Sequence, residues 1–179
     1  MKQNKLNLLI AAVLVLFAAI LKVATYPDTF SPIIAIALFS GAVITDKKLS
    51  FIMPLLAMFA SDIILEIFSI APGFYGLEQI GNYAALLFIT LLGFGMKKIN
   101  VITVVGFSLA SSVLFYFLSN TNTFFFDTFE FYENSFNGYI KCMTAGIPFI
   151  KYITDLVFSI ILFGSYVLIF KTSRSKVVA

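Results

Sequence analysis

Long apolar runs, separated by short polar segments, fill most of this chain. The runs lack the alternation of apolar and polar residues that marks a barrel strand, and most approach the ~20 residues that a helix needs to cross a bilayer. We therefore predict an all-α membrane protein, a six-transmembrane-helix bundle that forms a single integral membrane domain over residues 1–179. The predicted spans are residues 6–24, 31–45, 49–71, 80–96, 100–119 and 149–170, with a short extra helix over 138–147.

The first apolar run, residues 6–24, has a second interpretation as a cleaved signal peptide. The run is long for the apolar core of such a peptide, and no small-residue cleavage site follows it before Tyr26 and Pro27. We therefore favour a retained transmembrane helix.

The placement of lysines and arginines predicts the orientation, because these residues favour cytoplasmic loops. With six spans and a cytoplasmic N-terminus, nine of the 12 basic residues lie inside, and only Lys22, Lys141 and Lys151 lie on the outer side. We expect both termini in the cytoplasm and a multi-pass protein of the cell inner (cytoplasmic) membrane.

The composition supports this class and removes several functions. Hydrophobic residues make up 60% of the chain and charged residues 12%, against about 45–50% and about 25% in a soluble domain. The chain has no histidine, which excludes a His-Glu-x-x-His metalloprotease, and no glycine-rich phosphate loop. We predict no cofactor and no nucleic-acid partner. The single cysteine, Cys142, could be a soft metal ligand, but a lone buried thiol is more often packing, so we predict no metal site.

Charged residues inside or beside the spans are the candidate ligand-binding groups, and all are predicted to lie in the outer half of the membrane. They are Asp62, Glu66, Asp155, Lys22, Lys141 and Lys151. A charge at mid-membrane costs ~2.5–3.5 kcal/mol, so it should face a partner or a cavity. One interpretation is a polar pocket open to the outside. The other is structural, with the lysines snorkelling to the interface and the acids paired with them. We favour the pocket.

The aromatic stretch over residues 124–132 has two interpretations as well. Its rings, with Phe126 and Tyr132 as candidate ligand contacts, could cover the pocket and stack on a ring-containing ligand. They could instead sit at the level of the lipid headgroups. Small residues four apart, such as Ala37 with Gly41 and Ala57 with Ser61, predict close helix packing inside the bundle.

Three segments resemble the motifs of an uncharacterised bacterial family of small membrane proteins. Residues 30–42, FSPIIAIALFSGA, resemble its pattern F-[ST]-P-x-x-A-x-A-L-F-x-G-A. Residues 54–62, PLLAMFASD, resemble PL-x-AM-x-x-SD, and residues 145–166 resemble its C-terminal block. That family is similar to the S components, or substrate-binding subunits, of energy-coupling factor (ECF) vitamin transporters.

The resemblance implies a six-helix protein that binds a vitamin or related micronutrient from outside, with Asp62 and Asp155 near the ligand. S components work with a transmembrane T component and two ATPases. Many of them carry two alanines four apart on the first span, and residues 6–24 lack such a pair. Coupling to an ECF T component with its ATPases and action as a solitary transporter both stay open.

We therefore predict a non-enzymatic substrate-binding or transport protein, embedded in the lipid bilayer, that captures a small nutrient from the outer side. One alternative is a structural or assembly subunit without a ligand, whose charges are consumed by ion pairs and leave no cavity. The other is an intramembrane enzyme that uses Asp62 and Asp155 as a pair sharing one proton.

Overall fold

The computed structural model describes residues 31–126 and 131–175, together with Leu9, Val13, Phe17, Ile20, Leu21 and Ala24 of the N-terminal segment. This part of the chain is all-helical, which confirms the all-α part of the predicted fold class. The elements are α2 (Ile33–Val43), α3 (Lys47–Ile67), α4 (Leu77–Phe94), α5 (Val101–Phe125), α6 (Phe136–Gly146), the single 3-10 turn η1 (Ile147–Phe149) and α7 (Tyr152–Ser175).

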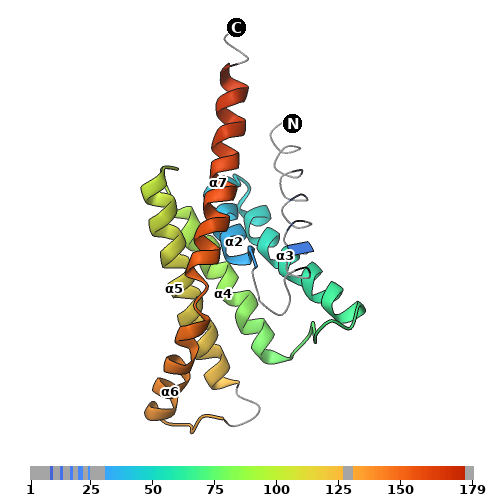
Figure 1. Cartoon of the computed structure of the whole chain (residues 1–179), viewed down its shortest axis with the longest axis vertical. Helices are drawn as coiled ribbons and strands as arrows, with labels where there is room; N and C mark the ends of the chain where they lie inside the picture. Colours follow the sequence, from blue (N-terminus) through green and yellow to red (C-terminus); the bar gives the residue numbers. More distant parts are fainter. Residues whose placement is uncertain are drawn as a thin grey trace.

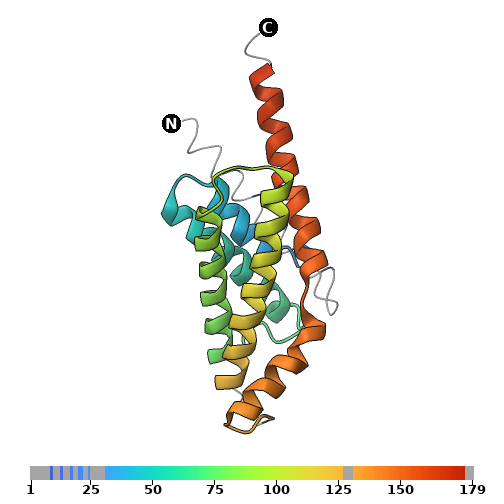
Figure 2. The same ribbon diagram turned by 90° about the vertical axis from the view of Figure 1, so that its left-hand side faces the viewer.

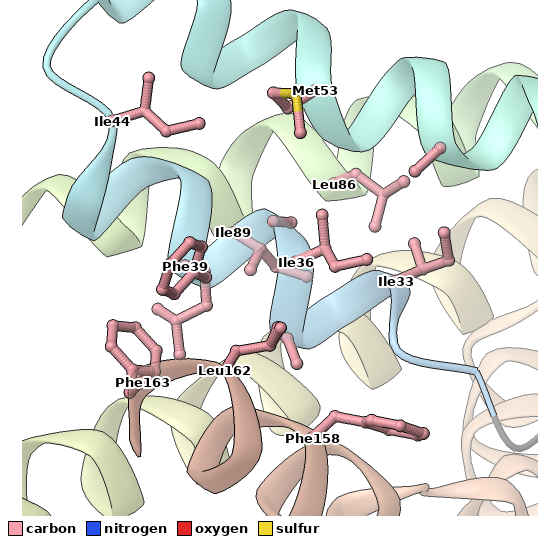
Figure 3. Packing of buried hydrophobic residues seen from close by; sticks show 14 of the residues in the cluster. Ile33, Ile36, Phe39, Ile44, Met53, Leu86, Ile89, Phe158, Leu162 and Phe163 are labelled. Carbon is pink, nitrogen blue, oxygen red and sulfur yellow. The ribbon is translucent and has the colours of Figure 1, made fainter. Parts of the chain in front are cut away.

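Helix α2 lies at the centre of the bundle, in contact with α3, α4, α5 and α7 (Figure 1). Its sequence is apolar on every side, and a helix of that kind is stable only when it is buried all round. Ile36, Leu38 and Phe39 accordingly have almost no exposed surface. Figure 3 shows side chains of α2 surrounded by residues of three neighbouring helices, namely Met53, Leu86, Ile89, Phe158, Leu162 and Phe163.

Helices α2 and α4 pack closely against each other at Gly41 and Gly93. Their Cα atoms approach so closely that a Cβ added to Gly93 would lie 3.0 Å from the Gly41 Cα and 2.5 Å from the Leu38 carbonyl oxygen. Ala37, Ala57 and Ser61 are fully buried as well. The predicted packing of small residues inside the bundle is confirmed.

Side chains at the polar turns cap the helices that follow them. The Asp46 carboxylate accepts hydrogen bonds from the backbone amides of Lys48 and Leu49, at 2.9 and 3.1 Å. Asn100 and Thr103 form a reciprocal capping box at the start of α5. Such contacts satisfy amides that have no partner within the helix, and they explain why α3 and α5 begin at these residues.

Three of the described helices, α3, α4 and α5, are long and apolar enough to cross a membrane. The α6–η1 segment and α7 pass the same test as a pair, bent by 52°, which gives up to four spans within the described residues. Several apolar helices thus fit a membrane protein. Helix α2 has 11 residues and is about 16 Å long, so it is too short to cross a ~30 Å hydrocarbon layer alone.

The predicted span over residues 6–24 falls largely outside the described residues. Its six described positions are helical. The Phe17 ring meets the Phe158 ring of α7 edge to face, with centroids 6.2 Å apart, and Leu21 packs against the buried core.

Two helix ends differ from the predicted ones. Helix α3 ends at Ile67 rather than 71, and Ser69 beyond it adopts a positive φ of 51°, which breaks the helix before Pro72. Helix α5 continues to Phe125, beyond the predicted end at 119. The helix extends beyond the predicted span because the polar residues there find partners: Asn122 and Thr123 bond to the Glu78 carbonyl oxygen and carboxylate, each at 2.6 Å.

The C-terminal third of the chain forms a bent pair. As predicted, a short helix precedes the last span, and η1 with Pro148 separates the two. Helix α7 then runs upward past the rest of the bundle in both views (Figure 2). The bend places the start of α7 beside the second half of α5, at the level where the cavity described next is found.

Candidate ligand-binding site

A cavity of about 510 Å³ lies between the N-terminal ends of α2, α4 and α7 and the C-terminal halves of α3 and α5. Most of its wall is apolar, and Ile33, Met58, Leu86, Phe115 and Phe149 are part of it. Small-molecule sites have volumes of about 300–1,000 Å³ and walls of this character, with a few polar groups that orient the ligand. The polar groups of this wall are Ser31, Asp62, Tyr75, Asn82, Lys151 and Asp155.

Asp62 enters the wall from α3 and is 1% exposed. Its Oδ2 atom accepts hydrogen bonds from the Gln79 side-chain amide at 2.7 Å and from the Tyr83 hydroxyl at 2.8 Å. Both donors belong to α4, so the carboxylate joins α3 to α4. Such charge-assisted hydrogen bonds are the strong ones, and they fix the carboxylate against the cavity.

The loop over residues 68–76 folds back onto α3 and closes the cavity at that end. Glu66 fastens it, because its Oε2 accepts from the Gly73 backbone amide at 2.7 Å. Gln79 donates to the Gly73 carbonyl oxygen at 2.9 Å. A Cβ on Gly73 would lie 2.0 Å from the Asp62 carbonyl oxygen, so only glycine allows this approach. Ala71, Pro72 and Tyr75 of the loop line the cavity.

Tyr75 and Asn82 provide a neutral polar edge. The Asn82 side-chain amide donates to the Tyr75 hydroxyl oxygen at 3.2 Å, which leaves the hydroxyl hydrogen for another acceptor. The Asn82 Oδ1 atom is buried and has no hydrogen-bond partner among the described residues. Burial raises the pKa of Tyr75, against the opposing effect of the Asn82 hydrogen bond. The hydroxyl therefore stays protonated and remains a donor.

Asp155 forms the opposite wall, in the first turn of α7. It is 1% exposed, and its Oδ2 accepts from the Ser112 hydroxyl of α5 at 2.6 Å. One turn deeper, the Ser159 hydroxyl meets the Ser108 hydroxyl at 3.1 Å. A buried polar seam thus runs from the cavity along the α5–α7 contact, and Asp155 is its only acid within the described residues.

A second cavity, of about 280 Å³, adjoins the first. Both cavities have Ile34, Phe115, Phe149, Lys151 and Asp155 in their walls, so Asp155 and Lys151 stand where the two meet. The second cavity adds hydroxyl and amide groups from α5, those of Ser112, Tyr116, Ser119 and Asn120. Tyr116 is held in place by donating to the Met143 carbonyl oxygen.

The structure thus brings three of the predicted site residues, Asp62, Asp155 and Lys151, to one cavity. The exposed Glu66 and Lys141 are not among the described lining residues, nor are Phe126 and Tyr132. Lys22 lies outside the described residues, as do positions 127–130 of the aromatic stretch.

Cys142 is 2% exposed, and its thiol lies 3.5 Å from the Asn120 carbonyl oxygen between α5 and α6. Within the described residues no group of three or more cysteines and acids could hold a metal ion.

Sequence reasoning missed Ser31, Tyr75, Asn82 and the serines of α5. Tyr75 and Asn82 are seven apart across the start of α4, and no periodic pattern relates them. Ser108, Ser111 and Ser112 did carry a signal, because polar residues three and four apart in an apolar helix mark a face turned away from lipid.

The fold and the cavity define a class: a protein whose described part is all-helical, with several helices of membrane-crossing length around a ligand-sized, mostly apolar cavity that carries a few polar groups. Residues 2–177 match a family of unknown function, DUF6580, and the chain belongs to that family. No curated protein and no solved structure matches it.

Proposed function

We propose that this protein is a membrane-embedded binding protein that captures a small organic nutrient, a vitamin or a vitamin precursor, from the outer side of the inner membrane. The single observation that carries the proposal is the convergence of two buried carboxylates, from α3 and α7, on one cavity of about 510 Å³. Charged groups inside a membrane are costly, and they mark substrate or ion sites by default.

The proposal includes six spans, with the short α2 enclosed by α3, α4, α5 and α7, and with both termini in the cytoplasm. In that orientation the cavity lies at the outer end of the bundle, because it is built from the loop after α3 and the segment before α7. The α2–α4 contact at Gly41 and Gly93 packs the opposite, inner end, where Phe39 and Phe163 also meet with ring centroids 5.2 Å apart. A ligand would enter from outside and be stopped by this packing.

Transport requires a further step, and an ECF-type T component with its ATPases is the proposed partner. The chain has no phosphate-binding loop of its own. Uptake that depends on co-expressed T component and ATPases supports this partnership, whereas uptake by the chain alone supports a solitary transporter.

The two alternatives fit the cavity less well. A structural subunit has no use for a void of this size lined by carboxylates. An aspartyl enzyme needs two carboxyls that share a proton, but Asp155 bonds to Ser112 and Asp62 to Gln79 and Tyr83. Within the described residues, no hydrogen bond joins the two acids.

A ligand screen tests the proposal. The purified protein, in detergent, is heated with water-soluble vitamins and their precursors, and the fraction that remains monodisperse is measured by size-exclusion chromatography. We expect at least one compound to raise the apparent melting temperature, and Asp62→Asn or Asp155→Asn to reduce that increase. Glu133→Gln, at an exposed acid in the loop before α6, is the matched control. A screen without a stabilising compound, together with variants that behave as wild type, refutes the function.

A further inference from the structure

Asp155 has an unusual environment for a carboxylate in an apolar bundle. It is almost fully buried, yet in the described part of the chain its hydrogen-bond partner is the neutral Ser112 hydroxyl, and no lysine or arginine lies within ion-pair distance. An ionised carboxylate buried without a countercharge is strongly unfavourable. The described residues therefore leave this carboxylate without a countercharge.

Two features favour the ionised form of this carboxylate and leave it available to a ligand. It lies in the first turn of α7, where the partial positive charge of a helix N-terminus stabilises an anion. Its Oδ2 atom is held by Ser112, while Oδ1 has no hydrogen-bond partner within the described residues and the side chain borders both cavities. Oδ1 is thus the atom offered to an incoming group.

Lys151 does not provide the missing charge. It precedes α7 by one residue, and its carbonyl oxygen accepts from the Asp155 backbone amide at 2.9 Å. Its side chain is exposed at the cavity wall, and it makes no ion pair with Asp155 among the described residues. The flexible ammonium of Lys151 stays hydrated at the cavity mouth, so it does not neutralise the buried carboxylate of Asp155.

We infer that the ligand of this site is an amphipathic organic cation whose positively charged nitrogen pairs with Asp155 Oδ1. The inference rests on the proposed binding function and specifies its ligand class. The apolar part of the cation would lie against Phe115, Phe149 and Leu86. A neutral polar group at its other end would face the Tyr75 hydroxyl hydrogen and the Asn82 Oδ1 atom, a donor beside an acceptor.

The experiment measures binding by isothermal titration calorimetry to the full chain in nanodiscs. The probes are the compounds that stabilise the protein in the vitamin screen and one matched set on a single ring skeleton: phenethylamine, phenethyl alcohol and phenylacetate. Phenethylamine is expected to bind in preference to its neutral and anionic analogues. Asp155→Asn is expected to weaken the binding of cations by about 10- to 100-fold, the effect of losing one charge-assisted hydrogen bond.

Asparagine can still accept from Ser112, so Asp155→Asn is expected to fold, and its elution from size-exclusion chromatography checks this. Asp155→Glu, which keeps the charge, should retain part of the affinity, and Glu133→Gln should bind as wild type. If the ligands found are anions or neutral compounds, or if Asp155→Asn binds cations as wild type does, the cation inference is overturned while the binding function stands. If no compound binds at all, both fall.

Discussion

A methyl group at Gly41 is the sharpest test of the packing that supports the cavity. The Cβ of alanine at this position would lie 2.1 Å from the Thr90 carbonyl oxygen and 3.1 Å from the Gly93 Cα. Real Cβ atoms stay at least about 3.0 Å from other heavy atoms, so α2 and α4 would have to separate by about 0.9 Å, the difference between 3.0 and 2.1. The atoms in the way are backbone, and no side-chain rotation relieves the clash.

Overpacking of a close-packed interior costs about 1–3 kcal/mol, which lowers the melting temperature of a chain of this length by roughly 2–4 °C for each kcal/mol. Gly164→Ala is the matched control, because nothing lies within 4 Å of a Cβ at that position of α7. Replacing a mid-helix glycine by alanine without a clash stabilises by about 0.5–1 kcal/mol. The two variants should therefore shift the melting temperature in opposite directions.

The single, buried Cys142 provides the assay. A maleimide dye that becomes fluorescent on reaction with a thiol stays dark until Cys142 is exposed, so its fluorescence against temperature reports unfolding. The reasoning fails if Gly41→Ala unfolds at the same temperature as Gly164→Ala, since the contact between α2 and α4 would then have room for a methyl group.

Three further predictions concern the site and the helix ends. Asp62→Leu removes the acceptor of two α4 donors, the buried Gln79 amide and the part-buried Tyr83 hydroxyl. A buried donor left without a partner costs about 1–3 kcal/mol, so Asp62→Asn, which keeps one oxygen, should melt clearly above Asp62→Leu. Equal melting temperatures would argue against the network. Asn100→Ala removes the cap of α5 and should destabilise by about 1 kcal/mol, measured as a lower melting temperature; an unchanged value would show that the cap is dispensable. Ala71→Leu adds bulk to the cavity wall and should abolish ligand-induced stabilisation, whereas Ala110→Leu, at an exposed position of α5, should leave it intact; a loss in both variants would point to a general defect.

The length of the apolar runs was sufficient to predict most of the helices. The runs that became α3, α4 and α5 are long and apolar, and in such runs only a helix satisfies every backbone group without water. The helix ends were harder to predict, because they depend on tertiary partners. Asn122 and Thr123 look like loop residues in the sequence, yet the backbone and side chain of Glu78 on α4 satisfy them and allow α5 to continue to Phe125.

From the sequence, only the charged residues of the site could be predicted. Asp62 and Asp155 were predicted because an acid in an apolar run has few structural uses. Glu66 was grouped with Asp62 by its helical spacing of four, but the loop over residues 68–76 returns to it and uses its carboxylate to hold Gly73. Tyr75 and Asn82 could not be predicted as a pair, because that loop alone brings them together.

The cavity exists because two helices begin at its level instead of passing through it. Helix α2 starts at Ile33, after Pro32, and α7 starts at Tyr152, after the η1 turn. Each late start leaves a space that α3, α4 and α5 border with polar side chains. Both helices also present their N-terminal ends to that space, and these ends carry partial positive charge. This partial charge stabilises Asp155 and disfavours a cation everywhere in the cavity except beside an acid. The helix ends that border the cavity therefore also determine where a positively charged nitrogen can bind.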